Sequence, residues 1–466
     1  MIPTDPAPGN EITARVLDRR PDGHHASGVT DAAGTQHRFG GLLWERNFRL
    51  LWTGETVSGL GNSMAVLGVP LLAVSQLHAG TFAVAALTAA AYFPWLIIGL
   101  PAGAWVDRLP LRQLMITCDL ISVVLFASVP VAAWAGVLGV GQLLVVEAAA
   151  GAAGIFFGAA YQAYLPVLVA RPNLMEGNAK LQGSGSAASI SGSALAGLAA
   201  EAVGYAAALL FNAASFAVSA VCLFAIRAES PARSHAARAT TIRADIAEGM
   251  RFVWRDRLLL RLTIFPAVAN IAYGGSLSIM VVFLVRVAHF GSATVGLLMA
   301  VSGAGSLIGA LMARRLARAL GTARASLLNV AVGGLGGLLI PLTAAGPRVL
   351  FYLAGTGIVS ATIVGNNIIM ASFRQAYSPP AMLGRIVASQ RFVAYGSAPL
   401  GALLAGVLAT ALAIRPALWI LLTVFALSGS LLLTRPMLAD RDLPAARTEP
   451  VLEAASGSQL DGTTTA

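Results

Sequence analysis

From Leu50 to Thr434 the chain is almost continuously apolar, interrupted only by short polar segments. Crossing a bilayer as a helix takes ~20 apolar residues, so this stretch is long enough for many crossings. Only 11% of the residues are charged, against roughly 25% in soluble domains, and the mean hydropathy is +0.75. These values exclude a water-soluble enzyme and predict an all-α integral membrane protein that crosses the bilayer repeatedly.

The apolar runs predict twelve transmembrane helices in two groups of six. We place them at 50–75, 82–105, 113–136, 140–165, 179–200, 204–226, 260–286, 292–313, 325–345, 349–371, 386–411 and 416–434. The expected domains are a disordered cytoplasmic tail over 1–44, a six-helix bundle over 45–226, a central cytoplasmic loop over 227–258, a second six-helix bundle over 259–435 and a disordered cytoplasmic tail over 436–466.

The net charge of the chain is +10, and its basic residues recur as small clusters on alternate loops between the apolar runs. A nucleic-acid binder would gather them on one face, so no nucleic-acid partner is expected. Cytoplasmic loops carry the Lys/Arg excess, which places both termini on the cytoplasmic side of a bacterial inner membrane. In the central loop, Ile242, Ile246 and Met250 recur at helical spacing. That spacing fits either a short amphipathic helix on the membrane surface or a solvated linker helix.

An internal repeat becomes visible when one half is shifted by 206 residues along the other. The shift superposes glycines and arginines, pairing Gly99 with Gly305, Gly103 with Gly309, Arg108 with Arg314 and Arg112 with Arg318. Parallel repeats of this kind build one large class of secondary transporters.

The most specific local motif runs from Gly99 to Arg112, reading GLPAGAWVDRLPLR, where the second span meets the cytoplasm. Two glycines one helical turn apart allow close approach of another helix. Asp107, with Arg108 and Arg112 beside it, can engage a helix terminus or form charge pairs. This motif resembles that of the major facilitator superfamily, in the loop between its second and third helices.

Further segments resemble the drug-exporter branch of that superfamily, which contains macrolide-efflux proteins and the enterobactin exporter. They include NFRLLW at 47–52, FNAASF at 211–216 and LGR at 383–385. The resemblance implies a two-bundle fold and export of an amphipathic small molecule by alternating access, with proton antiport and no cofactor. It also implies a gate in which Asp107 engages the start of the eleventh helix near Arg385. One such pair of bundles encloses its own pathway within the lipid, so a monomer is expected.

Two departures from the family pattern bear on proton coupling. The fifth helix reads SGSALAG at 191–197, without the Gly-Pro pair associated with antiporters. The fourth helix offers Glu147 where many proton-coupled exporters carry arginine. A facilitator or lipid flippase without proton coupling therefore stays open as the alternative.

A proton-coupled transporter needs a carboxyl group that exchanges protons inside a low-dielectric cavity. Three acids fall within predicted spans, namely Glu55, Asp119 and Glu147. Charged groups there cost ~2.5 kcal/mol or more on insertion scales, so all three are proton-coupling candidates. A structural role is the competing interpretation, for example pairing of Asp119 with Arg112.

Uncharged polar residues in the spans are candidates for the substrate cavity. The resemblance favours the first, fourth, seventh and tenth helices around the pathway, which selects Asn270, Tyr273, Asn366 and Asn367. Interhelical hydrogen bonding is the alternative for each of them. Arg391 falls inside the eleventh span and is expected to snorkel to the inner surface.

Other classes of function lack their sequence signatures. All six histidines fall in tails, loops or span ends, and the two cysteines lie in apolar runs, so neither a catalytic cluster nor a metal site is expected. An ATP-driven pump needs a Gly-Lys-Ser/Thr loop, but the only lysine is Lys180, between Ala179 and Leu181. A receptor or scaffold would need an extramembrane domain, which the short external loops do not provide.

Overall fold

A computed structural model describes residues 41–99, 101–106, 108–227, 251–378, 380–433, 437–438 and 440–443. These residues form helices and turns, and no strand occurs among them. The predicted amphipathic helix at Ile242 to Met250, most of both predicted tails and the motif residue Asp107 lie outside the described residues.

Six long helices form the N-terminal half, with a short one between the second and third. They are α1 (Arg46–Ser75), α2 (Thr81–Ile98), α3 (Ala102–Val106), α4 (Leu111–Trp134), α5 (Val140–Leu168), α6 (Leu174–Val203) and α7 (Tyr205–Ala225). The C-terminal half repeats this order. Its elements are α9 (Arg257–Ala269), η3 (Asn270–Gly274), α10 (Gly275–Ser278), α11 (Met280–Val282), η4 (Phe283–Val287), α12 (Ser292–Leu320), α13 (Thr322–Gly337), α14 (Val349–Tyr377), α15 (Pro380–Leu412) and α16 (Ile414–Ser428).

The structure repeats with the offset found in the sequence. Helix α6 begins at Leu174 and α15 begins at Pro380, which are 206 residues apart. The first residues of the other corresponding long helices are also about 206 positions apart, to within several residues. The two halves are therefore two copies of one six-helix unit, as the repeat predicted.

Eleven helical segments of the described residues are long and apolar enough to cross a membrane, so the predicted count of twelve is not fully met. The exception is α6, which corresponds to the fifth predicted span. It is as long as its neighbours and packs between α1 and α12, but serine, glycine and charged residues keep its hydropathy low. Its hydroxyl groups bond to the preceding turn of the helix, as Ser191 Oγ does to Ala187 O at 2.7 Å.

The second helix of each half ends differently. Helix α2 stops at Ile98, and α3 begins only at Ala102, whereas its repeat partner α12 continues unbroken to Leu320. Pro101 lies in the gap, and a proline lacks the backbone N–H that would continue the hydrogen bonding of the helix. At the corresponding place in α12 stands Leu307, which continues the helix.

The seventh transmembrane segment is the most irregular. It changes from α-helix to π-helix at η3, returns to α-helix and ends in a second π-helix at η4. Between α10 and α11, Ile279 leaves helical geometry with φ −103° and ψ 0°. Pro266 lies just before η3 and cannot donate a backbone hydrogen bond. Such π turns are rare and occur often at functional sites.

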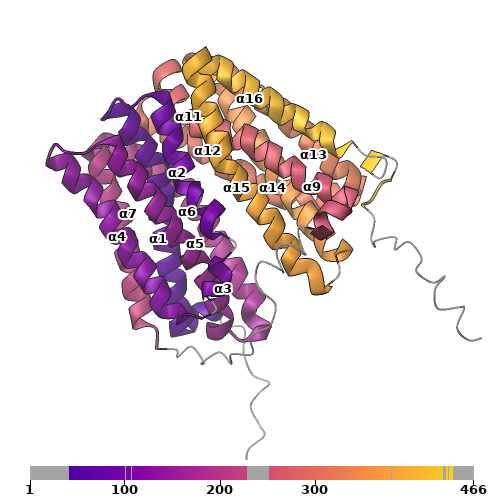
Figure 1. Cartoon of the computed structure of the whole chain (residues 1–466), viewed down its shortest axis with the longest axis horizontal. Helices are drawn as coiled ribbons and strands as arrows, with labels where there is room; N and C mark the ends of the chain where they lie inside the picture. Colours follow the sequence, from indigo (N-terminus) through magenta and orange to yellow (C-terminus); the bar gives the residue numbers. More distant parts are fainter. Residues whose placement is uncertain are drawn as a thin grey trace, which may run out of the picture.

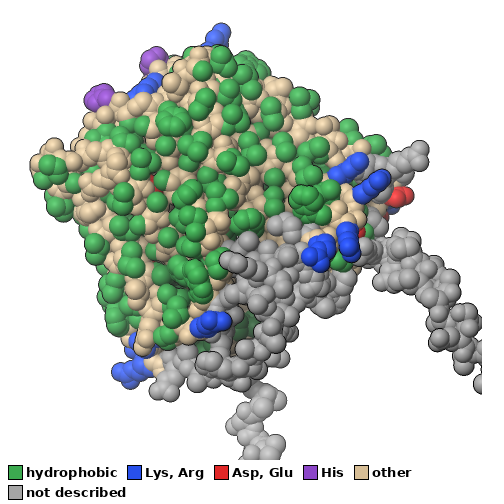
Figure 2. Space-filling view, in the orientation of Figure 1, with side chains coloured by type: hydrophobic (Ala, Val, Ile, Leu, Met, Phe, Trp, Pro, Cys, Tyr) green, Lys and Arg blue, Asp and Glu red, His purple; other side chains and the backbone are tan. Residues whose placement is uncertain are grey.

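The sides of the molecule are apolar and its ends are basic. Figure 2 shows hydrophobic side chains over the side of the bundle, with Lys and Arg near its ends. Many aliphatic side chains on these faces are exposed, such as Val124 at 69% and Leu335 at 68%. An exposed apolar belt of this kind is the surface that lipid covers.

Among the described residues, the hydrophobic clusters that combine both halves lie toward one end of the bundle. One hydrophobic cluster combines Leu71 and Ala196 of the N-terminal half with Phe283, Leu298 and Ala409 of the C-terminal half. All five lie toward the same end of the bundle, which we call the closed end. At the other end lie Arg108, Arg112, Arg314, Arg315 and Arg318, and we call it the arginine-rich end. In Figure 1 the halves meet near α11 and diverge toward α3.

The folded part extends beyond the predicted domain boundaries at both termini. Residues Gly41–Trp44, expected in the disordered tail, form a 3-10 helix, and Leu42 N donates to Glu176 Oε1 at 3.1 Å. At the C-terminus Met437 is fully buried, and Asp442 Oδ1 accepts a 2.8 Å hydrogen bond from Thr322 N. Both segments are held by short polar contacts with helix ends. Hydropathy contains no information on such contacts, so the predicted boundaries excluded these segments.

Candidate substrate-binding site

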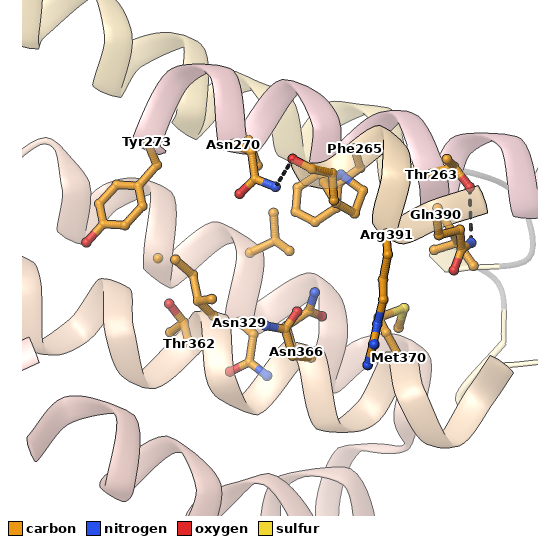
Figure 3. A pocket seen from close by; sticks show the side chains of 18 of the residues that line it. Thr263, Phe265, Asn270, Tyr273, Asn329, Thr362, Asn366, Met370, Gln390 and Arg391 are labelled. Carbon is orange, nitrogen blue, oxygen red and sulfur yellow. Dashed lines mark hydrogen bonds between the residues drawn. The ribbon is translucent and has the colours of Figure 1, made fainter. Parts of the chain in front are cut away.

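A cavity of about 450 Å³ opens in the C-terminal half. Its walls come from α9, η3, α13, α14, α15 and α16, and Figure 3 shows their side chains converging from opposite sides. Its apolar lining includes Phe265, Ile363, Met370 and Phe425. A mostly apolar pocket with a few convergent polar groups is typical of sites that bind small amphipathic molecules.

The four predicted cavity residues all lie on the wall of this cavity, namely Asn270, Tyr273, Asn366 and Asn367. Asn270 Nδ2 donates to the Ala394 carbonyl at 3.2 Å, which fixes the amide, and Figure 3 shows the residue at the upper wall. Asn367 is exposed to the cavity. The structure thus brings residues of the seventh and tenth segments together, although whether they bind substrate remains a prediction.

Asn366, like Asn270, makes the interhelical hydrogen bond that the structural alternative foresaw, and Tyr273 is held by ring packing. Asn366 is 7% exposed, and its Oδ1 accepts a 2.7 Å hydrogen bond from Ser326 Oγ. The ring of Tyr273 packs against that of Phe425 with centroids 5.2 Å apart. The wall therefore engages one amide atom of Asn270 and one of Asn366, while Asn367 is exposed at the cavity.

Three further polar residues on the wall were given no cavity role from the sequence. Asn329 of α13 is 7% exposed, and its Nδ2 is buried without a hydrogen-bond partner among the described residues. Arg374 falls outside the predicted span 349–371, but α14 continues to Tyr377 and carries it onto the wall. Arg391 was expected to snorkel to the inner surface, yet its side chain extends into the cavity. The sequence could have indicated a cavity role for Asn329, because it is a lone polar residue in an apolar run.

The carboxylate candidates lie in the N-terminal half and form two groups. Glu55 of α1 and Asp119 of α4 lie close enough to interact electrostatically, and Tyr161 of α5 is near Glu55. Asp119 is 1% exposed, lies within hydrogen-bonding reach of Ser219 and has Oδ2 unpartnered. Glu55 Oε1 is also buried without a partner. These two acids from different helices share one enclosed site.

Pairing of Asp119 with Arg112 is wrong. Arg112 instead caps the C-terminal end of α7, with Nε donating to Leu223 O at 2.8 Å and Nη2 to Phe224 O at 2.6 Å. The last carbonyls of a helix have no partner within it, so a guanidinium satisfies them. Asp119 is left without a cationic partner among the described residues.

Glu147 stands apart from the other two acids and nearer the boundary between the halves. It lies within electrostatic range of Tyr92. Beside these residues, Trp95 of α2 stacks on Tyr395 of α15 with ring centroids 4.6 Å apart. Tyr395 also lines the cavity. Glu147 is therefore the acid whose neighbours connect directly to the cavity wall.

The predicted gate is only partly described. Asp107 lies outside the described residues, Arg385 is described only as part of helix α15, and Arg108 is exposed. Gly99 ends α2. A Cβ added at Gly103 would meet no described atom within 4 Å, so no other helix of the described residues approaches closely there. Within the described ranges, no three His, Cys, Asp or Glu side chains gather as a metal site would require.

Comparison with known families agrees with this architecture. A sequence profile described as the Major Facilitator Superfamily matches residues 51–402. This chain belongs to the Major Facilitator Superfamily.

Named relatives within the superfamily are efflux pumps. The chain is 28% identical over 410 residues to the multidrug efflux pump Tap of Mycobacterium tuberculosis, covering 84% of this chain and 94% of that one. It is 29% identical over 409 residues to the pump Tap of Mycolicibacterium fortuitum, covering 84% and 97%.

Solved structures show the same superfamily fold. A mutant of the nucleoside transporter NupG superposes with a TM-score of 0.73 at 11% identity, covering 83% of this chain and 100% of that one. A bacterial homologue of the human lysosomal transporter Spinster, inward-facing and unoccupied, gives a TM-score of 0.66 at 11% identity, covering 83% and 95%.

Proposed function

We propose that this Major Facilitator Superfamily protein is a secondary exporter that moves an amphipathic small molecule out across the cytoplasmic membrane in exchange for protons. The observation that carries the proposal is the cavity between α9, α14 and α15, whose wall presents amide groups together with apolar side chains. The efflux pumps among its relatives support the direction of transport. An enzymatic role has no comparable support.

The arrangement of the halves fits alternating access. The positive-inside rule assigns the arginine-rich end, with both termini, to the cytoplasm. The closed end then faces outward, and this conformation is the one that receives substrate from inside. Rocking of the two repeats about their shared core would expose the same cavity to the other side. A single chain provides both repeats, so a monomer suffices.

The carboxyl groups of the N-terminal half are the proposed proton carriers. Glu55 and Asp119 share one buried site with unpartnered oxygens, and Glu147 adjoins the cavity through Tyr92 and Tyr395. Two carboxyl groups in one low-dielectric site do not readily ionise together. One proton held there is therefore expected to be gained and lost as the cavity changes sides.

Everted membrane vesicles from an efflux-deficient host test this function. The probes are ethidium, N-phenyl-1-naphthylamine and 8-anilino-1-naphthalenesulfonate, which are cationic, neutral and anionic amphipathic dyes. At least one should accumulate when the vesicles are energised and should release protons as it does so. Glu55→Gln and Glu147→Gln should abolish gradient-driven uptake while leaving dye exchange. The matched control is Glu45→Gln, an exposed acid at the start of α1.

Two results would count against the proposal. If uptake persists with an uncoupler and releases no protons, the protein is a facilitator or flippase and not a proton antiporter. The missing proline of the fifth helix favours this alternative. Uptake of none of the three dyes, with the protein present in the membrane, would reject the export of amphipathic compounds.

A further inference from the structure

Two arginines face the cavity near its arginine-rich end. Arg374 of α14 is half-buried, Arg391 of α15 is exposed, and both line the cavity. Figure 3 shows the Arg391 side chain crossing from α15 toward α14, with its guanidinium near Met370. The two guanidinium groups are close enough for their charges to repel one another. Two like charges held in one cavity are unfavourable unless something of opposite charge joins them.

The C-terminal half contains no acid to neutralise them. No Asp or Glu occurs in the sequence between Asp256 and Asp440. Asp256 is engaged elsewhere, since its Oδ1 accepts from Leu258 N at 2.9 Å and its Oδ2 accepts from Tyr377 at 2.9 Å. Among the residues whose side chains the structure describes, neither Arg374 nor Arg391 makes an ion pair or a side-chain hydrogen bond.

The arginine pair is not a general part of the repeated fold. With the offset of 206 residues, Arg374 corresponds to Leu168 and Arg391 to Gly185 in the N-terminal half. That half builds the same six-helix unit without them. A requirement of helix packing or membrane insertion common to both halves therefore does not explain the pair.

Simple snorkelling to the membrane surface does not describe Arg391 well. Helix α15 begins at Pro380, which places Arg391 roughly 16 Å along its axis at 1.5 Å per residue. Its side chain lies on the cavity wall beside Gln390. Gln390 Nε2 is held by Thr263 at 3.0 Å, and Asn329 Nδ2 is a buried donor without a partner on the opposite wall. The cavity thus offers hydrogen-bond donors and positive charge together.

We infer that this cavity binds an amphipathic anion, with its acidic group between Arg374 and Arg391 and its apolar body against Phe265, Met370 and Phe425. Guanidinium groups bind carboxylate, sulfonate and phosphate through charge-assisted hydrogen bonds. The inference rests on the proposed function and names the class of substrate. Recognition of the anion lies in the C-terminal half, while the carboxyl groups proposed to carry protons lie in the N-terminal half.

A matched pair of dyes tests the inference by binding. 8-Anilino-1-naphthalenesulfonate is N-phenyl-1-naphthylamine with one added sulfonate, so the pair differs in the anion alone. The affinity of each dye is measured with the full-length protein in phosphatidylcholine nanodiscs, after subtracting the signal of empty nanodiscs. Arg391→Gln and Arg374→Gln should each weaken binding of the sulfonate dye by about tenfold and leave the neutral dye unchanged.

Two controls separate charge from folding. Arg391→Lys retains the charge and should retain most of the affinity for the sulfonate dye. Arg348→Gln removes an exposed arginine at the opposite end of the α14 region and should change neither dye. The inference is overturned if the glutamine variants weaken both dyes equally, or if they weaken neither.

The anion could belong to a free compound or to a lipid headgroup, and adding phosphatidylglycerol to the nanodiscs distinguishes these sources. A lipid occupant would compete with the sulfonate dye in the wild-type protein but not in Arg391→Gln. Without such competition the anion belongs to a free compound. This assay measures binding, whereas the vesicle assay measures uptake. Loss of arginine-dependent binding would reject the anion site, and loss of dye uptake would reject the export function, so different results reject the two proposals.

Discussion

Arg112 and Arg391 carry the same charge but have opposite surroundings. The Arg112 guanidinium satisfies two carbonyl groups at the end of α7, where the helix dipole is negative. The Arg391 guanidinium makes no such hydrogen bond with the described residues, backbone or side chain. Residue type and depth along the chain therefore do not decide what an arginine does in this protein. The role of each arginine depends instead on whether a helix C-terminus or a carboxylate lies close enough to accept its hydrogen bonds.

Replacing Arg112 should destabilise the N-terminal half. Arg112→Gln loses charge-assisted hydrogen bonds of 2.8 and 2.6 Å, and leaves terminal carbonyls of α7 unpaired. Bonds of this kind contribute about 1.5–3 kcal/mol. The purified variant should unfold at a lower temperature than the wild-type protein, whereas Arg49→Gln, an exposed arginine on α1, should not. Equal melting temperatures for Arg112→Gln and wild type would contradict the capping role.

At the scale of elements, the repeated glycine pair works differently in the two halves. A Cβ at Gly309 would collide with the backbone of Ala361 on α14, and one at Gly305 would collide with Gly357. In the N-terminal half the corresponding helices α2 and α5 also meet closely, where a Cβ at Gly151 would collide with Ala91. Past the break at Pro101, however, a Cβ at Gly103 would meet no described atom within 4 Å. One sequence motif therefore forms a tight helix contact in α12 and a loose end in α2.

This difference predicts unequal effects of one substitution at matched positions. Gly309→Ala should lower the stability of the purified protein by about 1–3 kcal/mol, the usual cost of overpacking. Gly103→Ala should change it by less than ~0.5 kcal/mol. Thermal unfolding in detergent measures both variants. If Gly103→Ala proves the more damaging to stability, the assignment of close packing to α12 is wrong.

Much of this element-scale structure could be predicted from the sequence, because hydropathy and the repeat determine where helices cross the bilayer. Asn270 and Asn367 were placed near one another through the repeat and the family resemblance. Hydropathy marks the apolar part of a helix and not its end, so Arg374 was assigned to a loop. It also carries no information on helix rotation, so the direction of Asn329 and of Arg391 could not be predicted.

At the scale of the whole molecule, the closed end is held by a few polar contacts around an apolar core. Arg286 Nη2 donates to Ala79 O at 2.7 Å across the two halves. Tyr205 and Ser292 share a 2.9 Å hydrogen bond, and Glu201 accepts from Ala293 N at 3.2 Å. Gly197 and Gly296 meet backbone to backbone beside them. These contacts must separate if the cavity is to open on this side.

Weakening the closed end should shift the protein toward the opposite conformation. Arg286→Gln loses the bond to Ala79, and the distance between spin labels at Val137 and Arg348, on exposed loops of the two halves, should broaden toward longer values. Electron paramagnetic resonance of the labelled protein measures the distribution. Arg415→Gln, whose Nη2 bonds to Thr343 within one half, is the control. An unchanged distribution in Arg286→Gln would show that this contact does not hold the halves together.

The polarity of α6 has a consequence for biogenesis. A helix with this many serines and glycines partitions poorly from the translocon into lipid when judged alone. A Cβ at Gly192 would collide with the α1 residues Leu60 and Ser63, so α6 fits closely against a helix synthesised long before it. We therefore expect the nascent chain to retain α1 near the exit site until α6 emerges, and α6 to be stabilised by that partner instead of by the surrounding hydrocarbon.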